Sequence, residues 1–119
     1  MKRDLVLCRT LLLAVEAWER PFAVPLDHLE ADAEVVAYHA EKLMEAGYLI
    51  GAVLADETRL QVRVDRLTSA GHDLVELLRN AAAFRYAMDT LGDKVQVHTF
   101  ALLEQVLNGY AGFRLSGLD

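Results

Sequence analysis

Residues 37–50 have the sequence AYHAEKLMEAGYLI, which contains the end of a helix, a turn and the start of a strand. Val36, Ala40 and Leu43 are spaced at i, i+4 and i+7, which is typical of one buried helix face. Gly47 follows at the position where helices commonly end in a left-handed glycine. The pattern therefore predicts a helix that ends at Gly47 and leads directly into a strand.

The clearest β pattern follows this helix. Residues 51–55 are an apolar run, and residues 56–58 are of turn-forming types. Apolar and polar residues then alternate over residues 59–66, which gives a strand one dry and one solvated face. The two strands and their short connection predict a β-hairpin whose solvated face carries Arg59 and Arg63.

Further helices are predicted on both sides of this unit. Residues 2–19 carry two adjacent apolar stripes and predict a largely buried helix that ends before Pro21. Residues 22–26 are expected to form a brief extended segment. Asp32 suits the N-cap of the helix that ends at Gly47.

The chain after the hairpin is predicted to be helical almost to its end. Thr68 suits the cap of a helix whose apolar pattern continues to Leu91, where Gly92 breaks it. A last helix is predicted from Thr99 to Tyr110, with apolar residues along one face.

The order of helix, short connection, helix, hairpin and helix is that of a winged helix-turn-helix. We therefore predict an α+β, mostly helical fold with a β-hairpin wing and extra C-terminal helices, as a single domain over residues 1–119. Residues 1–67 would form the helix-turn-helix and wing, and residues 68–119 the C-terminal helices. The helix-turn-helix is abbreviated, because only about one turn, Leu26–Glu30, is available for its support helix.

Three strings occur in order along the chain: Met1-Lys2-Arg3-Asp4-Leu5, the string from Tyr38-His39 to Ala46-Gly47, and Arg66-Leu67-Thr68 followed by Gly71-His72-Asp73. Together they resemble a phage- and prophage-associated bacterial family that is a domain of unknown function. Its members are about this long, so the resemblance covers nearly the whole chain, although the C-terminal third matches only in pattern. The resemblance implies a winged-helix-like fold and transfers no activity and no binding residue.

Composition excludes several classes of protein. The 119 residues include 12 Lys and Arg, 18 Asp and Glu, and a single cysteine. This length suits one domain, the lone Cys8 excludes a disulfide scaffold, and the acidic balance argues against a nucleic-acid coat protein or a membrane-surface protein. No apolar run is long enough to span a membrane, and the N-terminal residues do not follow the pattern of a signal peptide. We therefore predict a cytoplasmic protein without membrane contact.

The negative charge is concentrated where a DNA-binding winged helix needs cations. Residues 27–58 contain one Lys against eight Asp and Glu, whereas residues 59–66 contain three Arg against one Asp. Phosphate contacts require Lys or Arg, and base contacts require Arg, Lys, Asn or Gln at the front of the recognition helix. That front instead consists of Asp32, Ala33, Glu34 and Val35.

Two functions therefore stay open. The first is a non-enzymatic interaction or regulatory module that acts mainly through protein contacts. The alternative is a DNA-binding regulator that uses the recognition helix 33–46 and the wing 51–66. Its candidate nucleic-acid-binding residues are Arg59, Arg63, Lys42 and Tyr38. The two arginines suit a solvated strand edge equally well.

No motif indicates an enzyme, a metal site or a cofactor. The sequence has no phosphate-binding glycine loop and no nucleophile elbow. Its histidines and Cys8 are scattered without metal-ligand spacing. We therefore expect no catalytic residue, no bound metal and no cofactor.

The C-terminal third contains more large apolar residues than a winged-helix core usually requires. They either complete the core of the single chain or form a homodimer interface, since obligate interfaces resemble a core cut in half. We favour the homodimer. Its candidate interface residues are Phe84, Met88, Leu91, Phe100 and Leu103.

Overall fold

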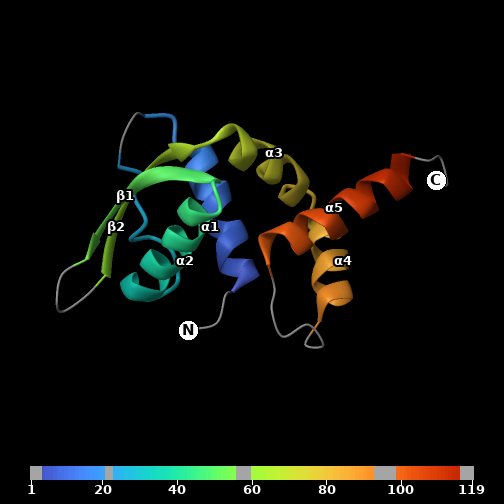
Figure 1. Cartoon of the computed structure of the whole chain (residues 1–119), viewed down its shortest axis with the longest axis horizontal. Helices are drawn as coiled ribbons and strands as arrows, with labels where there is room; N and C mark the ends of the chain where they lie inside the picture. The colour runs from blue at the N-terminus through green and yellow to red at the C-terminus, as the bar shows by residue number, and fades with distance from the viewer. Residues whose placement is uncertain (1–3, 21–22, 56–59, 93–98, 116–119) are drawn as a thin grey trace. The chain divides into compact units, whose positions relative to one another are not determined.

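The computed structural model describes residues 4–20, 23–55, 60–92 and 99–115 (Figure 1). These ranges contain five helices and one two-stranded antiparallel sheet, in the order α1 (Leu5–Ala17), α2 (Ala33–Glu45), β1 (Leu49–Ala55), β2 (Leu60–Leu67), α3 (Ser69–Leu78), α4 (Ala81–Leu91) and α5 (Phe100–Leu115). The predicted α+β, mostly helical class is therefore confirmed. The chain forms two compact units, Met1–Val75 and Glu76–Asp119.

The first helix, α1, supplies much of the core of the first unit. Asp4 is its N-cap, and the Asp4 carboxylate accepts a hydrogen bond of 3.1 Å from the Leu7 N–H. Its buried side chains are Leu5, Cys8, Leu11, Leu12 and Val15. The helix packs against α2 and β2, so the predicted burial of this segment is confirmed.

The second helix, α2, ends as its sequence predicts. Asp32 is the N-cap, and Gly47 adopts a left-handed conformation with φ +88°. The Gly47 N–H donates to the Met44 carbonyl, and the Tyr48 N–H donates to the Leu43 carbonyl. These bonds close the helix and direct the chain into β1.

The hairpin lies along α2, which contacts both of its strands (Figure 1). In its register, Gly51 lies opposite Val64, Val53 opposite Val62 and Leu54 opposite Gln61. A bulge separates Ile50 from Gly51. The predicted alternation is confirmed, because Val64 is fully buried while its neighbour Arg63 is exposed.

Gly51 is required by the close approach of the two strands. A Cβ atom at this position would collide with the backbone carbonyl oxygen of Arg63, and it would lie 3.0 Å from the Cε atom of Met44. Any larger residue would therefore push β1 away from β2 or from α2.

The connection between α1 and α2 contains no described helix. The Val24 N–H donates a 2.8 Å hydrogen bond to the Val64 carbonyl, so this extended segment lies along the edge of β2. The Leu29 N–H then donates to the Leu26 carbonyl at 3.2 Å, which closes a single turn. This segment thus contains a single hydrogen-bonded turn, which agrees with the one turn predicted for Leu26–Glu30.

The prediction that one helix continues to Leu91 is wrong. Thr68 caps α3 as expected, but that helix ends at Leu78. The side-chain oxygen of Asn80 then accepts hydrogen bonds from the Ala82 and Ala83 N–H groups and starts α4. Asn favours this capping role over a position inside a helix, so the helix is interrupted although the apolar pattern continues.

The second unit is built mainly from α4 and α5, which pack against each other. Gly92 ends α4 with φ +50°, as predicted. Helix α5 extends to Leu115, five residues beyond the predicted end at Tyr110. None of the helices within the described ranges has the length and apolar character that a membrane crossing requires.

Candidate functional site

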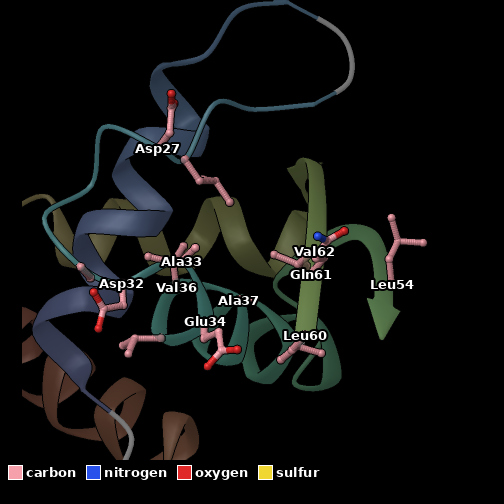
Figure 2. Close-up of a pocket in the computed structure, with 13 residues that line it drawn as sticks. Asp27, Asp32, Ala33, Glu34, Val36, Ala37, Leu54, Leu60, Gln61 and Val62 are labelled. Atoms are coloured by element: carbon pink, nitrogen blue, oxygen red, sulfur yellow. The ribbon is translucent and has the colours of Figure 1, made fainter. Parts of the chain in front are cut away.

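A groove opens between the first turns of α2 and the hairpin (Figure 2). Its volume is about 770 Å³. Its lining comes from the turn before α2 (Leu26, Asp27, Ala31), the start of α2 (residues 32–37), and the hairpin (Leu54, Leu60, Gln61, Val62). The groove therefore lies where a winged helix would place the front of its recognition helix beside the wing.

One side of the groove is acidic. Asp27, Asp32 and Glu34 are exposed, and in the described part of the chain their carboxylates have no hydrogen-bond or ion-pair partner. Figure 2 shows Asp32 and Glu34 beside the first turn of α2. The positive end of the helix dipole stabilises carboxylates at this position, which compensates part of their mutual repulsion. No Lys, Arg or His is among the described residues that line the groove.

The hairpin side of the groove is mostly apolar, with the exposed amide of Gln61 among its aliphatic residues. Leu60 and Val62 of β2 are half-buried, and Leu54 of β1 is 56% exposed. Val35 adds a half-buried apolar side chain from α2. The groove thus offers carboxylates and exposed aliphatic surface together, which is suited to a ligand that is both cationic and apolar.

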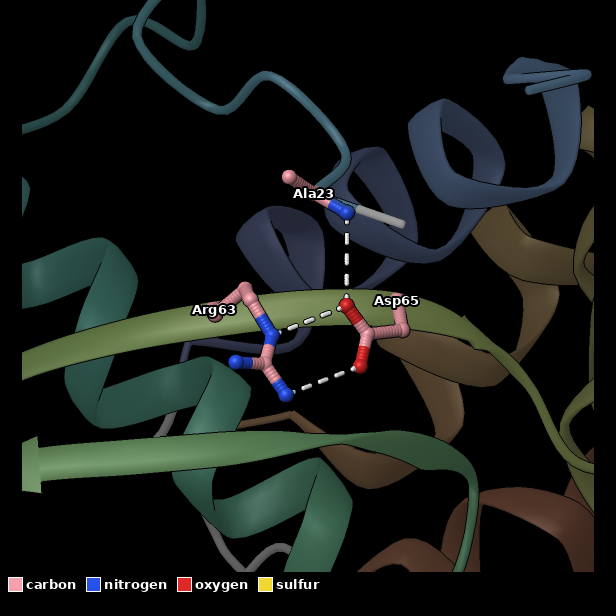
Figure 3. A network of polar contacts seen from close by, with 3 residues as sticks. All are labelled: Ala23, Arg63 and Asp65. Atoms are coloured by element: carbon pink, nitrogen blue, oxygen red, sulfur yellow. Dashed lines mark hydrogen bonds and ion pairs between the residues drawn. The ribbon is translucent and has the colours of Figure 1, made fainter. Parts of the chain in front are cut away.

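Arg63, a predicted DNA contact on β2, is paired within its own strand. Its Nε and a terminal nitrogen lie 3.0 and 3.2 Å from the two carboxylate oxygens of Asp65 (Figure 3). Asp65 also accepts a 3.2 Å hydrogen bond from the Ala23 N–H. The Arg63 hydrogen bonds, followed by the Ala23 N–H, lower the pKa of the Asp65 carboxyl. The Arg63 charge is therefore compensated before any phosphate could approach.

Two other predicted DNA contacts, Lys42 and Tyr38, form a small cluster on α2. The Lys42 Nζ atom lies 3.3 Å from a Glu45 carboxylate oxygen and 5.4 Å from the centre of the Tyr38 ring. Neither residue is part of the groove lining. Arg59 lies outside the described residues, so the structure places three of the four predicted residues and joins only Lys42 with Tyr38.

A buried histidine connects α2 with the start of α1. His39 is 1% exposed, and its Nε2 atom accepts a 2.8 Å hydrogen bond from the Asp4 N–H. Because Nε2 is an acceptor, the proton resides on Nδ1, which donates to the Val35 carbonyl at 2.7 Å. His39 thus satisfies the N-cap amide of another helix, a role that a capping box assigns to a residue of the same helix.

A second polar joint connects the hairpin with α2 and α3. The Thr68 hydroxyl donates to the Gly47 carbonyl and accepts a 3.0 Å hydrogen bond from the Gly71 N–H. The Thr68 N–H donates to the Tyr48 carbonyl at 3.0 Å. A Cβ atom on Gly71 would collide with that same Tyr48 oxygen. The second and third strings described above therefore meet at one structural joint.

The candidate dimer residues are mostly buried in the single chain. Phe84, Leu91, Phe100 and Leu103 are buried, and Met88 is half-buried. Packing within the chain accounts for their apolar character, and a homodimer through these helices stays a prediction. The described residues bring no three His, Cys, Asp or Glu side chains into an arrangement that could hold a metal ion.

Several groove residues carried no signal in the sequence. Asp32 and Glu34 stood out through their charge, but Asp27 is an ordinary turn residue. Leu54 and Leu60 belong to strands whose apolar residues were expected to be buried. Only the folded chain brings the groove residues between positions 26 and 37 beside Leu54 and residues 60–62.

The sequence of the chain has a counterpart among known protein families. A family model described as a hypothetical protein, DUF2513, matches residues 2–96. The chain belongs to the DUF2513 family. No curated protein and no solved structure matches it. DUF2513 is a domain of unknown function, so the resemblance to a family without assigned activity is confirmed. The match covers α1 to α4 and ends before α5.

Proposed function

We propose that this DUF2513 chain is a non-enzymatic winged-helix module that acts through protein contacts. The observation that carries the proposal is the acidic and apolar groove between the start of α2 and the hairpin. A DNA-binding winged helix needs cations at that place, because phosphate neutralisation drives its affinity.

The order of the elements supports the winged-helix assignment. Helices α1 and α2 are followed by the β1–β2 hairpin and then by α3, with a single hydrogen-bonded turn in place of a full support helix. In this assignment α2 is the recognition helix and the hairpin is the wing. The phage and prophage association and the cytoplasmic location stay predictions.

The charges argue against DNA as the main ligand. The start of α2, which would reach base edges, presents the carboxylates of Asp32 and Glu34, which have no partner among the described residues. Arg63 on the wing is held by both carboxylate oxygens of Asp65, and bidentate pairs of this kind are the strong ones. A phosphate would therefore meet repulsion from α2 and would compete with Asp65 for Arg63.

The groove instead suits a cationic, apolar peptide segment of a partner protein. Lys or Arg side chains of such a segment would pair with Asp27, Asp32 and Glu34. Its aliphatic side chains would cover Leu54 and Leu60, which are accessible now. Recognition of an amphipathic segment in a groove is a common mode of protein binding.

Titration with mixed-sequence duplex DNA tests the proposal directly. At about 50 mM salt, where phosphate contacts count most, we expect no binding at micromolar protein. Micromolar or tighter binding that is weakened by the Arg59→Ala/Arg63→Ala variant would instead establish the alternative, a DNA-binding regulator.

A short Leu/Lys peptide is the positive probe for the groove, with its Leu/Glu counterpart as control. We expect the Leu/Lys peptide to bind and the Asp32→Asn/Glu34→Gln variant to weaken it about tenfold, since exposed ion pairs contribute about 1 kcal/mol or less each. The matched control, Asp73→Asn/Asp89→Asn, removes two exposed carboxylates elsewhere. Equal weakening in both variants would show that the peptide responds only to net charge, and the groove proposal would fail.

A further inference from the structure

We propose that the free edge of β1 pairs with β1 of a second copy of the chain, which would join two hairpins into one four-stranded sheet. This interface is the outer backbone edge of β1 and is separate from the candidate residues on α4 and α5; of the β1 residues, only Leu54 also lines the groove. It rests on the hydrogen-bonding pattern and composition of β1 and does not depend on the proposed function.

The backbone pattern identifies the groups that face outward. The Val64 carbonyl accepts a hydrogen bond from Val24, so the polar backbone groups of Val64 point away from β1. Residues that lie opposite each other in an antiparallel ladder share their bonding state, so the backbone groups of Gly51 also point outward. The alternation along a strand then gives Val53 the same direction. In the described ranges no backbone group pairs with this outer edge.

The composition of β1 leaves this edge unprotected. Its sequence, LIGAVLA, has no charged residue and no proline. Ile50, Val53 and Leu54 are 37%, 38% and 56% exposed. Natural edge strands usually carry Lys, Pro or a bulge that prevents pairing, and here the only bulge lies at the start of the strand, beside Ile50.

The outer edge of β2 differs from the edge of β1 in both its backbone hydrogen bonds and its charge. Val24 covers it with a backbone hydrogen bond, and Arg63 and Asp65 form a charged pair on the strand. The two edges of the hairpin are therefore unequal, and β1 is the one able to accept another strand.

A second copy of β1 is complementary to this edge in its backbone hydrogen bonds and meets no charge on it. Two chains of net charge −6 repel each other, but β1 is uncharged, so its pairing with itself places no like charges side by side. A two-fold axis at Val53 would let the two Val53 residues exchange both backbone hydrogen bonds and would place Gly51 opposite Ala55. One strand pair is smaller than a standard interface, so the dimer should be weak and concentration-dependent.

Sedimentation of the full chain, without peptide or DNA, tests the inference. From micromolar to about millimolar protein, the mass should rise from 13.3 kDa towards twice that value. The Val53→Pro variant should stay monomeric, because proline removes an outward N–H and no hairpin hydrogen bond. Circular dichroism would verify that the variant is folded.

Matched charge variants separate the edge from the rest of the hairpin. Leu54 and Gln61 lie opposite each other, so Leu54→Lys and Gln61→Lys add the same charge to neighbouring strands. We expect Leu54→Lys to weaken self-association at least tenfold and Gln61→Lys to change it less than twofold.

Amide hydrogen exchange of the unmodified chain provides a readout that needs no variant. Exchange at Gly51 and Val53 should slow as protein concentration rises, because these amides become hydrogen-bonded only in the dimer. A chain that stays monomeric at all concentrations would overturn the inference. A dimer that leaves these two amides unprotected, or that Val53→Pro leaves intact, would do so as well. Protection that requires a foreign strand would assign the edge to a different partner.

Discussion

Helix α2 presents two surfaces that differ in how their polar groups are satisfied. Towards α1, His39 is buried and both of its ring nitrogens are hydrogen-bonded. At the groove, Asp32 and Glu34 are exposed, and no described residue partners them. An unpaired buried polar group lowers stability, whereas exposed carboxylates can stay free for a ligand. The first surface therefore determines the fold, and the second is available for function.

Several residues of the strings that resemble the family make hydrogen bonds between elements, as His39 does. The Asp4 N–H contacts His39, and Thr68 connects Gly47 with Gly71. These residues hold the elements together, and none of them lines the groove between α2 and the hairpin. The resemblance therefore concerns the architecture, and a functional test must target other residues.

Among substitutions at the contacts that hold the elements together, Gly71→Ala should lower the stability most. Its new Cβ would overlap the Tyr48 backbone carbonyl, which cannot move without disturbing the hydrogen bond from Thr68. We expect a loss of about 3 kcal/mol in the free energy of unfolding, measured by urea denaturation. Gly109→Ala is the control, because no atom lies within 4 Å of its added Cβ. That helical substitution should stabilise by up to about 1 kcal/mol. Equal effects of the two variants would contradict the proposed role of the joint.

The second-largest loss of stability is expected for His39→Ala. The change leaves the Asp4 N–H and the Val35 carbonyl without their side-chain partner and creates a cavity between α1 and α2. We expect a loss of about 2 kcal/mol, again from urea denaturation. His72→Ala removes an exposed imidazole from α3 and should change stability by less than about 0.5 kcal/mol. A small effect at both positions would remove the distinction between the two surfaces of α2.

The sequence was sufficient to predict elements whose signal is local. The spacing of Val36, Ala40 and Leu43, the glycine at position 47 and the alternation in β2 each depend on neighbouring residues. The break at Asn80 was missed because the apolar pattern continues across it, while the capping hydrogen bonds of Asn80 stop the helix.

The groove and the His39 contact depend on residues far apart in the chain. His39 contacts the backbone 35 positions earlier, and no periodicity indicates that pairing. The Arg63–Asp65 pair did have a local signal, since residues two apart share one face of a strand. For Arg63 the sequence left a phosphate contact and a solvated strand edge open, and neither of these includes the pair.

Asp65 tests the difference between hydrogen-bonded polar groups and the groove carboxylates, and its expected effect is the smallest. Its carboxylate is hydrogen-bonded to Arg63 and to the Ala23 N–H. Its hydrogen bonds from Arg63 and from the Ala23 N–H lower its pKa. Ala23 has a left-handed φ of +47°, which is unfavourable for alanine, so the second bond also holds a strained turn against β2. Asp65→Asn should therefore destabilise the chain at neutral pH, by less than His39→Ala does.

The pH dependence distinguishes this role from a general loss of charge. Because the pKa of Asp65 is lowered on folding, its contribution is fully present above the unfolded value of about 3.9 and is lost as pH falls through the folded pKa. The difference in unfolding free energy between the unmodified chain and Asp65→Asn should stay constant above about pH 5 and shrink below about pH 4. Urea denaturation across this range measures it, with Asp32→Asn as the control at a carboxylate that has no partner among the described residues. A difference that stays unchanged down to pH 2 would show that the Asp65 carboxylate contributes nothing through its charge to folding.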